Sequence, residues 1–227
     1  MRASVVQAVT FDVGGTLLKV WPSVGHIYGE VAAEHGVDGL VADVLNARFA
    51  ATWKNSKGFR HSRGDWARLV DATFQGLTAV RPSRSFFDEL WDRFSYPEAW
   101  HVFEDVVPTL EGLAARGIRL AVISNWDERL RLLLQRLKLA RHFEVLTVSR
   151  EVGAAKPARA IFRHAARSLG LPPSAILHVG DDWEADVRGA RAAGFAARWL
   201  DRRDGKGRRQ HIASLLELAT CLRVEAA

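Results

Sequence analysis

The sequence predicts an α/β fold: a doubly wound parallel β-sheet with helices on both faces and a mostly α-helical domain inserted after the first strand. From Phe103 onward, apolar segments of strand length alternate with amphipathic segments of helix length, joined by short links. Glycines close three of these helices, at Gly117, Gly170 and Gly194. Between residues 21 and 100, by contrast, apolar residues recur at helical spacing and no convincing strand is found.

The elements expected from these patterns divide the chain into a core and an insertion. Core strands are expected at Val5–Phe11, Ile118–Ile123, Val145–Val148, Ala175–Val179 and Phe195–Trp199. Core helices are expected at Val107–Arg116, Asp127–Leu139, Ala158–Leu169, Trp183–Ala193 and Ile212–Leu222. Helices of the insertion are expected at Val24–His35, Leu40–Asn55, Asp65–Val80 and Ser85–Phe94. We therefore assign residues 1–20 and 101–227 to the core and residues 21–100 to an inserted helical cap.

The composition is typical of a soluble globular protein, with 48% hydrophobic and 26% charged residues in a chain of 227. The net charge is +6, but the basic residues are spread along the chain, which favours a small anionic substrate over a nucleic acid. The single cysteine excludes an internal disulfide and fits a reducing compartment. No apolar run approaches the ~18 residues needed to cross a membrane. We expect a cytoplasmic protein without membrane or nucleic-acid partners; the sequence leaves its oligomeric state undetermined.

The first strand ends on a lone carboxylate, Asp12, and two glycines, Gly14 and Gly15, follow almost at once. Such a turn exposes backbone N–H groups at the carboxyl end of a strand, where ligands bind in open α/β sheets. Taken alone, the same residues are also compatible with a simple Asx turn. The residues at the other strand ends favour the ligand site.

Polar residues follow two further strands in the same way. Ser124 and Asn125 end the strand Ile118–Ile123 and can donate hydrogen bonds to an anion. Lys156 follows the strand Val145–Val148 and precedes Pro157, a residue suited to the first turn of a helix. Lys156 is therefore expected at a helix N-terminus that faces the ligand edge of the sheet.

An acidic cluster follows the strand Ala175–Val179. Asp182 and Glu184 are explained equally well by a favourable interaction with the macrodipole of the next helix. Asp181 leaves its strand in the way that Asp12 leaves the first, and Asp186 follows closely. Carboxylates on neighbouring strands repel one another unless a hard cation lies between them, and Mg²⁺ is the natural candidate.

The order of these motifs resembles the haloacid dehalogenase superfamily, most of whose members are Mg²⁺-dependent phosphatases. The matching segments are Phe11–Leu17, Ile123–Asn125, Lys156 with Pro157, and Gly180–Asp182 with Asp186. The resemblance implies a Rossmann-like core and a helical cap of the phosphoglycolate phosphatase or 2-haloacid dehalogenase type. It also implies a hydrolase that acts on a small phosphorylated substrate.

The resemblance assigns roles to individual residues. Asp12 would be the nucleophile that forms an aspartyl-phosphate, and Lys156 would be the second catalytic residue. Magnesium would be held by the Asp12 carboxylate, the backbone carbonyl of Gly14, and Asp181, with support from Asp186. The phosphoryl group would be bound by Gly15, Thr16, Ser124, Asn125 and Lys156.

One position departs from the pattern of the phosphatases. These enzymes usually carry a second aspartate two residues after the nucleophile as a general acid and base, and here that position is Gly14. Glycine still offers a carbonyl to a metal but has no proton to donate. A histidine of the cap, His26 or His61, could supply the proton instead.

Three alternatives to a phosphatase stay open. A phosphonatase would need a cap lysine, and Lys54 and Lys57 are present, although their polar context does not favour a desolvated amine. A 2-haloacid dehalogenase lacks the second aspartate too, but needs neither metal nor the acids at positions 181 and 186. A non-catalytic member would bind a phosphorylated ligand without turning it over.

Overall fold

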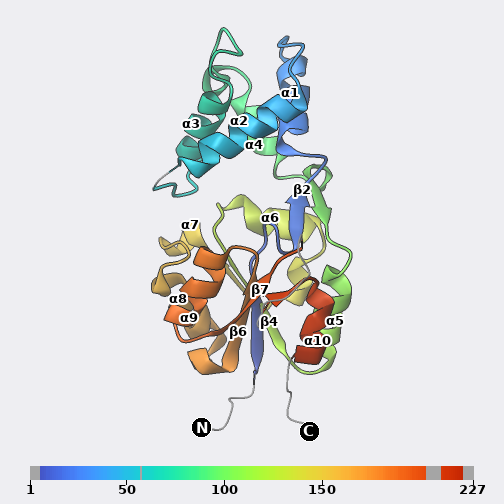
Figure 1. Ribbon diagram of the computed structural model, residues 1–227, viewed down its shortest axis with the longest axis vertical. Coiled ribbons are helices and arrows are strands. Elements are labelled where there is room, and N and C mark those ends of the chain that lie inside the picture. The colour runs from blue at the N-terminus through green and yellow to red at the C-terminus, as the bar shows by residue number, and fades with distance from the viewer. Residues whose placement is uncertain (1–5, 57, 203–210, 222–227) are drawn as a thin grey trace. The chain divides into compact units, whose positions relative to one another are not determined.

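The computed structural model describes residues 6–56, 58–202 and 211–221. The chain divides into two compact units, which are shown in Figure 1. The core unit comprises Met1–Lys19 and Val102–Ala227, and the helical unit comprises Val20–His101. The two passages of the chain between these units include a two-stranded sheet of β2 (Leu18–Val20) and β3 (Trp100–Val102).

The core unit is built on a six-stranded sheet in the order β5-β4-β1-β6-β7-β8, and all its pairings are parallel. The strands are β1 (Ala8–Phe11), β4 (Arg119–Ser124), β5 (Val145–Val148), β6 (Ile176–Gly180), β7 (Ala196–Leu200) and β8 (His211–Ile212). This arrangement confirms the predicted doubly wound α/β class. Because β1 lies between β4 and β6 in parallel register, the residues that follow Phe11, Ile123 and Val179 meet at one edge.

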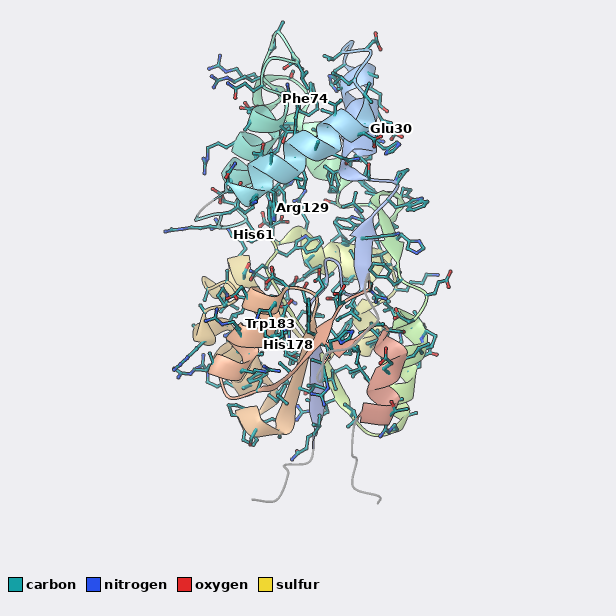
Figure 2. All side chains as sticks on the ribbon, in the orientation of Figure 1. Glu30, His61, Phe74, Arg129, His178 and Trp183 are labelled. Carbon is teal, nitrogen blue, oxygen red and sulfur yellow. The ribbon has the colours of Figure 1, made fainter. Side chains whose placement is uncertain are left out.

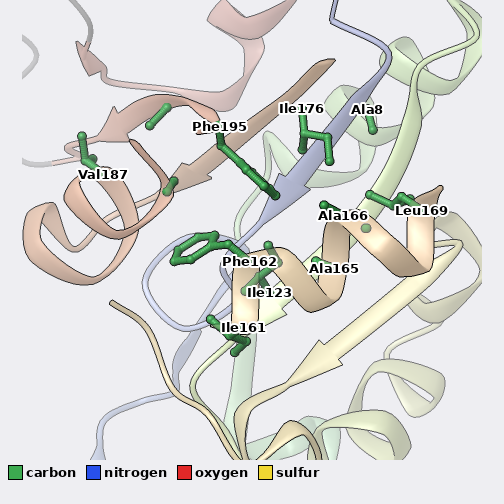
Figure 3. Close-up of a cluster of buried hydrophobic side chains, with 13 residues drawn as sticks. Ala8, Ile123, Ile161, Phe162, Ala165, Ala166, Leu169, Ile176, Val187 and Phe195 are labelled. Atoms are coloured by element: carbon green, nitrogen blue, oxygen red, sulfur yellow. The ribbon is translucent and has the colours of Figure 1, made fainter. Parts of the chain in front are cut away.

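Helices cover both faces of this sheet, with α8 and α9 on one side and α5 and α10 on the other (Figure 1). The core helices are α5 (Val106–Ala115), α6 (Arg129–Arg136), α7 (Ser149–Val152), α8 (Arg159–Leu169), α9 (Gly189–Ala192) and α10 (Leu218–Cys221). The buried face of α8 places Ile161 and Phe162 in an apolar cluster with Ala8, Ile123 and Ile176 of the sheet (Figure 3). This burial fixes the strand ends that carry the polar residues.

The helical unit has its own apolar core. Its helices are α1 (Val24–Glu34), α2 (Ala42–Lys54), α3 (Arg63–Thr73) and α4 (Phe87–Arg93). Tyr28 stacks on Phe74, which in turn contacts Phe86 edge-on, so that one aromatic group joins three segments. The Ser62 hydroxyl and the Asp65 carboxylate form a capping box that begins α3. The expected mostly helical character of the insertion is therefore confirmed.

Several element boundaries differ from the predictions. The helix predicted at Asp65–Val80 ends at Thr73, and Gly76, with φ of +76°, lies in the turn beyond it. Ile212 belongs to β8, and the final helical segment begins only at Leu215. The helix predicted at Trp183–Ala193 begins as a π-helix over Trp183–Arg188 before it continues as α9.

The prediction that Lys156 lies at a helix N-terminus is wrong, because α8 starts only at Arg159, with Ala158 as its N-cap. Lys156 lies in the loop that precedes this helix. Among the residues that the structure describes, none of the helices combines the length and the hydropathy that a bilayer-spanning segment requires. Val5, Lys57 and Leu222, each named in a prediction, lie outside the described ranges.

Candidate active site

Asp12 is the first residue after β1, and the Asp12 N–H donates to the carbonyl of Val179 on the neighbouring strand at 2.9 Å. The chain then turns sharply, and the Gly15 N–H donates to the carbonyl of Leu18 at 2.8 Å. Gly15 has φ of +78°, and a Cβ built on it would lie 2.3 Å from Asp181 Oδ2. Only glycine therefore allows this turn to approach the acidic cluster so closely.

The Lys156 side chain joins two of the carboxylates. The Lys156 ammonium lies 2.6 Å from Asp12 Oδ1 and 2.6 Å from Asp186 Oδ1. All three side chains are largely buried, with exposed fractions of 2% for Lys156, 11% for Asp12 and 1% for Asp186. Such charged groups are tolerated away from water because they are paired and hydrogen-bonded.

Ser124 and Asn125 reach the same place from the end of β4. The Ser124 hydroxyl donates to Asp12 Oδ1 at 3.0 Å. The Asn125 amide instead binds the main chain of Lys156: its Nδ2 donates to the Lys156 carbonyl at 3.0 Å, and its Oδ1 accepts from the Lys156 N–H at 2.7 Å. Asn125 therefore fixes the loop that carries the lysine.

The third carboxylate of the cluster is Asp181. One oxygen each of Asp12, Asp181 and Asp186 lie within 4.8 Å of one another, and the Thr16 hydroxyl donates to Asp181 Oδ1 at 3.2 Å. Three hard oxygen donors at this spacing are the donor set that a divalent cation such as Mg²⁺ prefers. A single lysine does not neutralise three carboxylates, so the charge of the cluster also fits a bound cation.

The neighbouring acids have local structural roles. Asp182 is the N-cap of the π-helix, and its Oδ1 accepts from the Ala185 N–H at 2.8 Å. Glu184 pairs with Arg188 one helical turn later, and both side chains are well exposed. These contacts bear out the alternative in which Asp182 and Glu184 serve the helix that they begin.

Burial and neighbouring charges shift the pKa of each group in the cluster. Burial raises the pKa of Asp12, and the opposing effect of Lys156 does not return it to its usual range. Burial also acts to lower the pKa of Lys156, but Asp12 and Asp186 outweigh it and raise that pKa. Desolvation acts to raise the pKa of Asp186, but Lys156 and His178 outweigh it and lower that pKa. Desolvation of its carboxyl group and then the charges of Asp12 and Asp186 raise the pKa of Asp181 to about 7.

Gly14 lies beside the indole of Trp126, since a Cβ built on this glycine would lie 3.4 Å from the ring. Trp126 therefore lines the turn that follows Asp12. Trp183 instead packs edge-on against Trp199 of β7, with ring centroids 5.5 Å apart. The Trp199 indole N–H donates to the Asp181 carbonyl at 2.9 Å, so β7 helps to place this acid.

The candidate residues of the helical unit have contacts within that unit. His26 Nδ1 lies 2.7 Å from the Ser23 hydroxyl at the start of α1. His61 is buried, and its ring packs edge-on against Phe59 at 5.0 Å. Lys54 is exposed at the end of α2, which is not the desolvated setting that a Schiff-base lysine requires.

Two residues of the site, His178 and Thr10, were not predicted from the sequence. His178 on β6 is fully buried, with Nε2 3.1 Å from Asp186 Oδ1 and Nδ1 2.9 Å from the Thr10 hydroxyl of β1. Figure 2 places His178 within the core unit. The available signal was a single polar residue inside each of two strands that are otherwise apolar, Ala8–Phe11 and Ile176–Gly180.

Comparison with known proteins assigns the chain to a family. The model of the haloacid dehalogenase-like hydrolases matches residues 6–194, and the protein belongs to this family of hydrolases. The chain is 35% identical over 200 residues to haloacid dehalogenase-like hydrolase domain-containing protein 3 of Mus musculus. That match covers 84% of this chain and 80% of the mouse protein.

Two further similarities are to enzymes with different substrates. The chain is 31% identical over 227 residues to the phosphoserine phosphatase of Thermus thermophilus, covering 87% of this chain and 89% of that protein. It is also similar to the crystal structure of 2-haloacid dehalogenase from Pseudomonas syringae pv. Tomato DC3000, with a TM-score of 0.67 and 26% identity. That similarity covers 95% of this chain and 97% of the dehalogenase. The proteins to which this chain is similar thus include a phosphatase and a dehalogenase, so the site residues must decide between these two chemistries.

Proposed function

We propose that the protein is a Mg²⁺-dependent phosphohydrolase that acts on small phosphorylated substrates through an aspartyl-phosphate on Asp12. The observation that carries this proposal is the juxtaposition of three carboxylates with one lysine, in which Lys156 lies 2.6 Å from both Asp12 and Asp186. The similarity to the phosphoserine phosphatase of Thermus thermophilus also supports phosphoryl chemistry.

In the proposed reaction Asp12 attacks the phosphorus atom of the substrate. A bond forms between a carboxylate oxygen and phosphorus, and the bond from phosphorus to the leaving oxygen breaks with its electron pair. Water then cleaves the aspartyl-phosphate, which releases phosphate and restores Asp12. Lys156, Ser124 and Thr16 would hold the phosphoryl oxygens, while Asn125 keeps the Lys156 loop in place. The predicted role of Gly15 in binding phosphate is reduced to shaping the turn, because its N–H donates to the Leu18 carbonyl.

The proposed ligands of the metal are Asp12, Asp181 and the backbone carbonyl of Gly14, with Asp186 in support. This assignment rests on the three carboxylates, of which one oxygen each lie within 4.8 Å of one another. When bound, Mg²⁺ would supply positive charge that offsets the carboxylates and the phosphoryl oxygens. Asp181 and Asp12 must both be ionised to bind the cation in this arrangement.

The proposed enzyme has no acidic side chain at position 14, so no group at this position would protonate the leaving group as it departs. General acid catalysis is typically worth ~10²–10⁴-fold in rate. We therefore propose a preference for acidic leaving groups, such as those of aryl and acyl phosphates.

The experiment that tests this proposal is a screen of phosphate esters at neutral pH with and without Mg²⁺. We expect magnesium-dependent release of p-nitrophenol from p-nitrophenyl phosphate, and we expect Asp12→Asn to abolish it. Asp182→Asn is the matched control, because Asp182 caps a helix and asparagine caps equally well. This variant should retain the activity.

The rival functions give different products in the same screen. Chloride release from 2-chloropropionate without metal would overturn the phosphatase proposal in favour of a dehalogenase. Aldehyde release from a phosphonate, stopped by borohydride, would indicate a Schiff base on a lysine. Binding of Mg²⁺ and phosphate without any turnover would favour a non-catalytic member of the family.

A further inference from the structure

Thr10 and His178 form a polar pair inside the sheet. They occupy paired register positions on the neighbouring strands β1 and β6, and neither residue is exposed. A polar side chain that is buried without a hydrogen bond lowers stability, so a pair retained in the sheet needs partners. The His178 ring also packs edge-on against Phe162, with centroids 5.3 Å apart, which limits its movement.

Both ring nitrogens of His178 are hydrogen-bonded. An ionised carboxylate only accepts, so Nε2 carries its hydrogen and donates to Asp186 Oδ1 at 3.1 Å. Nδ1 lies 2.9 Å from the Thr10 hydroxyl, which can either donate or accept. The Thr10 hydroxyl therefore gives Nδ1 a hydrogen-bond partner while Nε2 donates to Asp186.

The donors around Asp186 nearly fill its acceptor positions. Oδ1 accepts from both His178 and Lys156, and Oδ2 accepts from the Asp182 N–H at 3.0 Å. A carboxylate has about four such positions, so these three donors fix its orientation. Lys156 is held in turn between Asp186 and Asp12. A continuous series of hydrogen bonds thus runs from Thr10 in the sheet to the proposed nucleophile.

We propose that His178 is a positioning residue, which together with Thr10 orients Asp186 so that Asp186 holds Lys156 against Asp12. The proposal rests on the proposed function in assigning Asp12 and Lys156 to the reaction. Without the His178 donor, Oδ1 loses one of its two partners, and the carboxylate can rotate away from the position that aligns Lys156. The two hydrogen bonds of the His178 ring go to Asp186 and Thr10, so His178 acts on Asp12 only through other residues.

The kinetic test uses His178→Phe, which keeps a ring against Phe162 and removes both nitrogens, and His178→Gln, whose amide can donate near the Nε2 position. We expect kcat for p-nitrophenyl phosphate to fall ~10–100-fold in His178→Phe, with a smaller change in KM, and to recover substantially in His178→Gln. Thr10→Val should lower kcat about fivefold, as expected for the loss of one hydrogen bond.

Thr147→Val is the matched control. Thr147 is buried in β5 of the same sheet, and its hydroxyl makes no hydrogen bond in the described part of the chain. This variant should leave kcat unchanged. Equal loss of activity in Thr147→Val and Thr10→Val would overturn the proposal, as would unchanged kcat in His178→Phe.

A second measurement does not depend on turnover. The Lys156 ammonium is buried between two carboxylates, so we expect a protected ¹H–¹⁵N signal from Nζ in the wild-type protein. The signal should be lost in His178→Phe and retained in His178→Gln and Thr147→Val. If the wild-type protein hydrolyses no phosphate ester, the proposed function fails, but the signal still tests the role of His178. If His178→Phe does not fold, Thr10→Val should weaken the signal, and an unaltered signal would overturn the proposal.

Discussion

Arg202 Nη2 donates a 2.7 Å hydrogen bond to the main-chain oxygen of Thr16, although 186 residues separate them. The same guanidinium pairs with Asp105 through two bonds of 3.0 Å. Asp105 also accepts from the Ser214 hydroxyl at 2.8 Å and from the Leu215 N–H at 2.9 Å. Arg202 thus joins the turn after Asp12 to Asp105 before α5, and Asp105 in turn binds the segment after β8.

We expect Arg202→Lys to destabilise the protein, because a lysine cannot reproduce the planar fork that spans Asp105 and Thr16. The expected loss in the free energy of unfolding is on the order of 2 kcal/mol, measured by urea denaturation. Arg198→Lys is the control, since Arg198 lies on β7 and makes a long 3.4 Å bond to its neighbour's carbonyl. Equal stability of the two variants would contradict the role assigned to Arg202.

Gly14→Asp should add the missing general acid. A Cβ at this position meets Trp126 at 3.4 Å, an ordinary contact, so the fold should accept the change. We expect kcat for an alkyl phosphate to rise by up to ~10²-fold, with a smaller change for p-nitrophenyl phosphate. Gly15→Ala is the contrasting variant: its Cβ would lie 2.3 Å from Asp181, and it should lose activity. If kcat rises for neither substrate in Gly14→Asp, the missing general acid does not limit the rate.

The pKa of about 7 for Asp181 predicts a pH dependence of Mg²⁺ binding. Above pH 7 the carboxylate is ionised and can bind the cation, whereas below pH 7 protons compete and affinity should fall up to tenfold per unit. In the metal-free protein the stability, unlike the affinity for Mg²⁺, decreases as pH rises. The folded-state pKa exceeds the ordinary 3.8, so the contribution of Asp181 to stability is present at low pH and is lost as pH rises toward 7.

Thermal unfolding between pH 5.5 and 8.5 checks this prediction. The increase in Tm on addition of Mg²⁺ should grow as pH rises through 7. Asp181→Asn should show little increase at any pH. A metal-induced increase that is constant across this range would show that Asp181 does not control binding.

Gly189→Ala should destabilise the protein through its contacts with the loop that carries Lys156. A Cβ on Gly189 would lie 2.9 Å from the Pro157 backbone and 2.9 Å from the Phe162 ring. Relief of this overlap should cost ~1–3 kcal/mol in the free energy of unfolding. Gly112→Ala in α5 is the control, because nothing lies within 4 Å of its Cβ, and it should stabilise by ~0.5–1 kcal/mol. Urea denaturation of both variants distinguishes overlap from helix propensity.

Much of the fold could be predicted because local patterns determine it. Apolar strands that alternate with glycine-capped helices require a parallel sheet, and parallel strands bring their carboxyl ends to one edge. For this reason the order of residues along the chain is enough to place Asp12, Ser124 and Asp181 together. The β2–β3 pair and the π-helix at Trp183–Arg188 could not be predicted, since short strands and helix irregularities depend on contacts with distant residues.

The sequence by itself determined the class of fold and which polar side chains lie at the strand ends, because each follows from the order of residues along single elements. The family was indicated by the resemblance of four motifs spread along the chain. Only the tertiary structure decided what each polar group binds. Asn125 holds the main chain of Lys156 from 31 residues away, and His178 meets Thr10 across 168 residues. Hydrogen bonds of this kind depend on strand register and side-chain packing, which no local sequence pattern specifies.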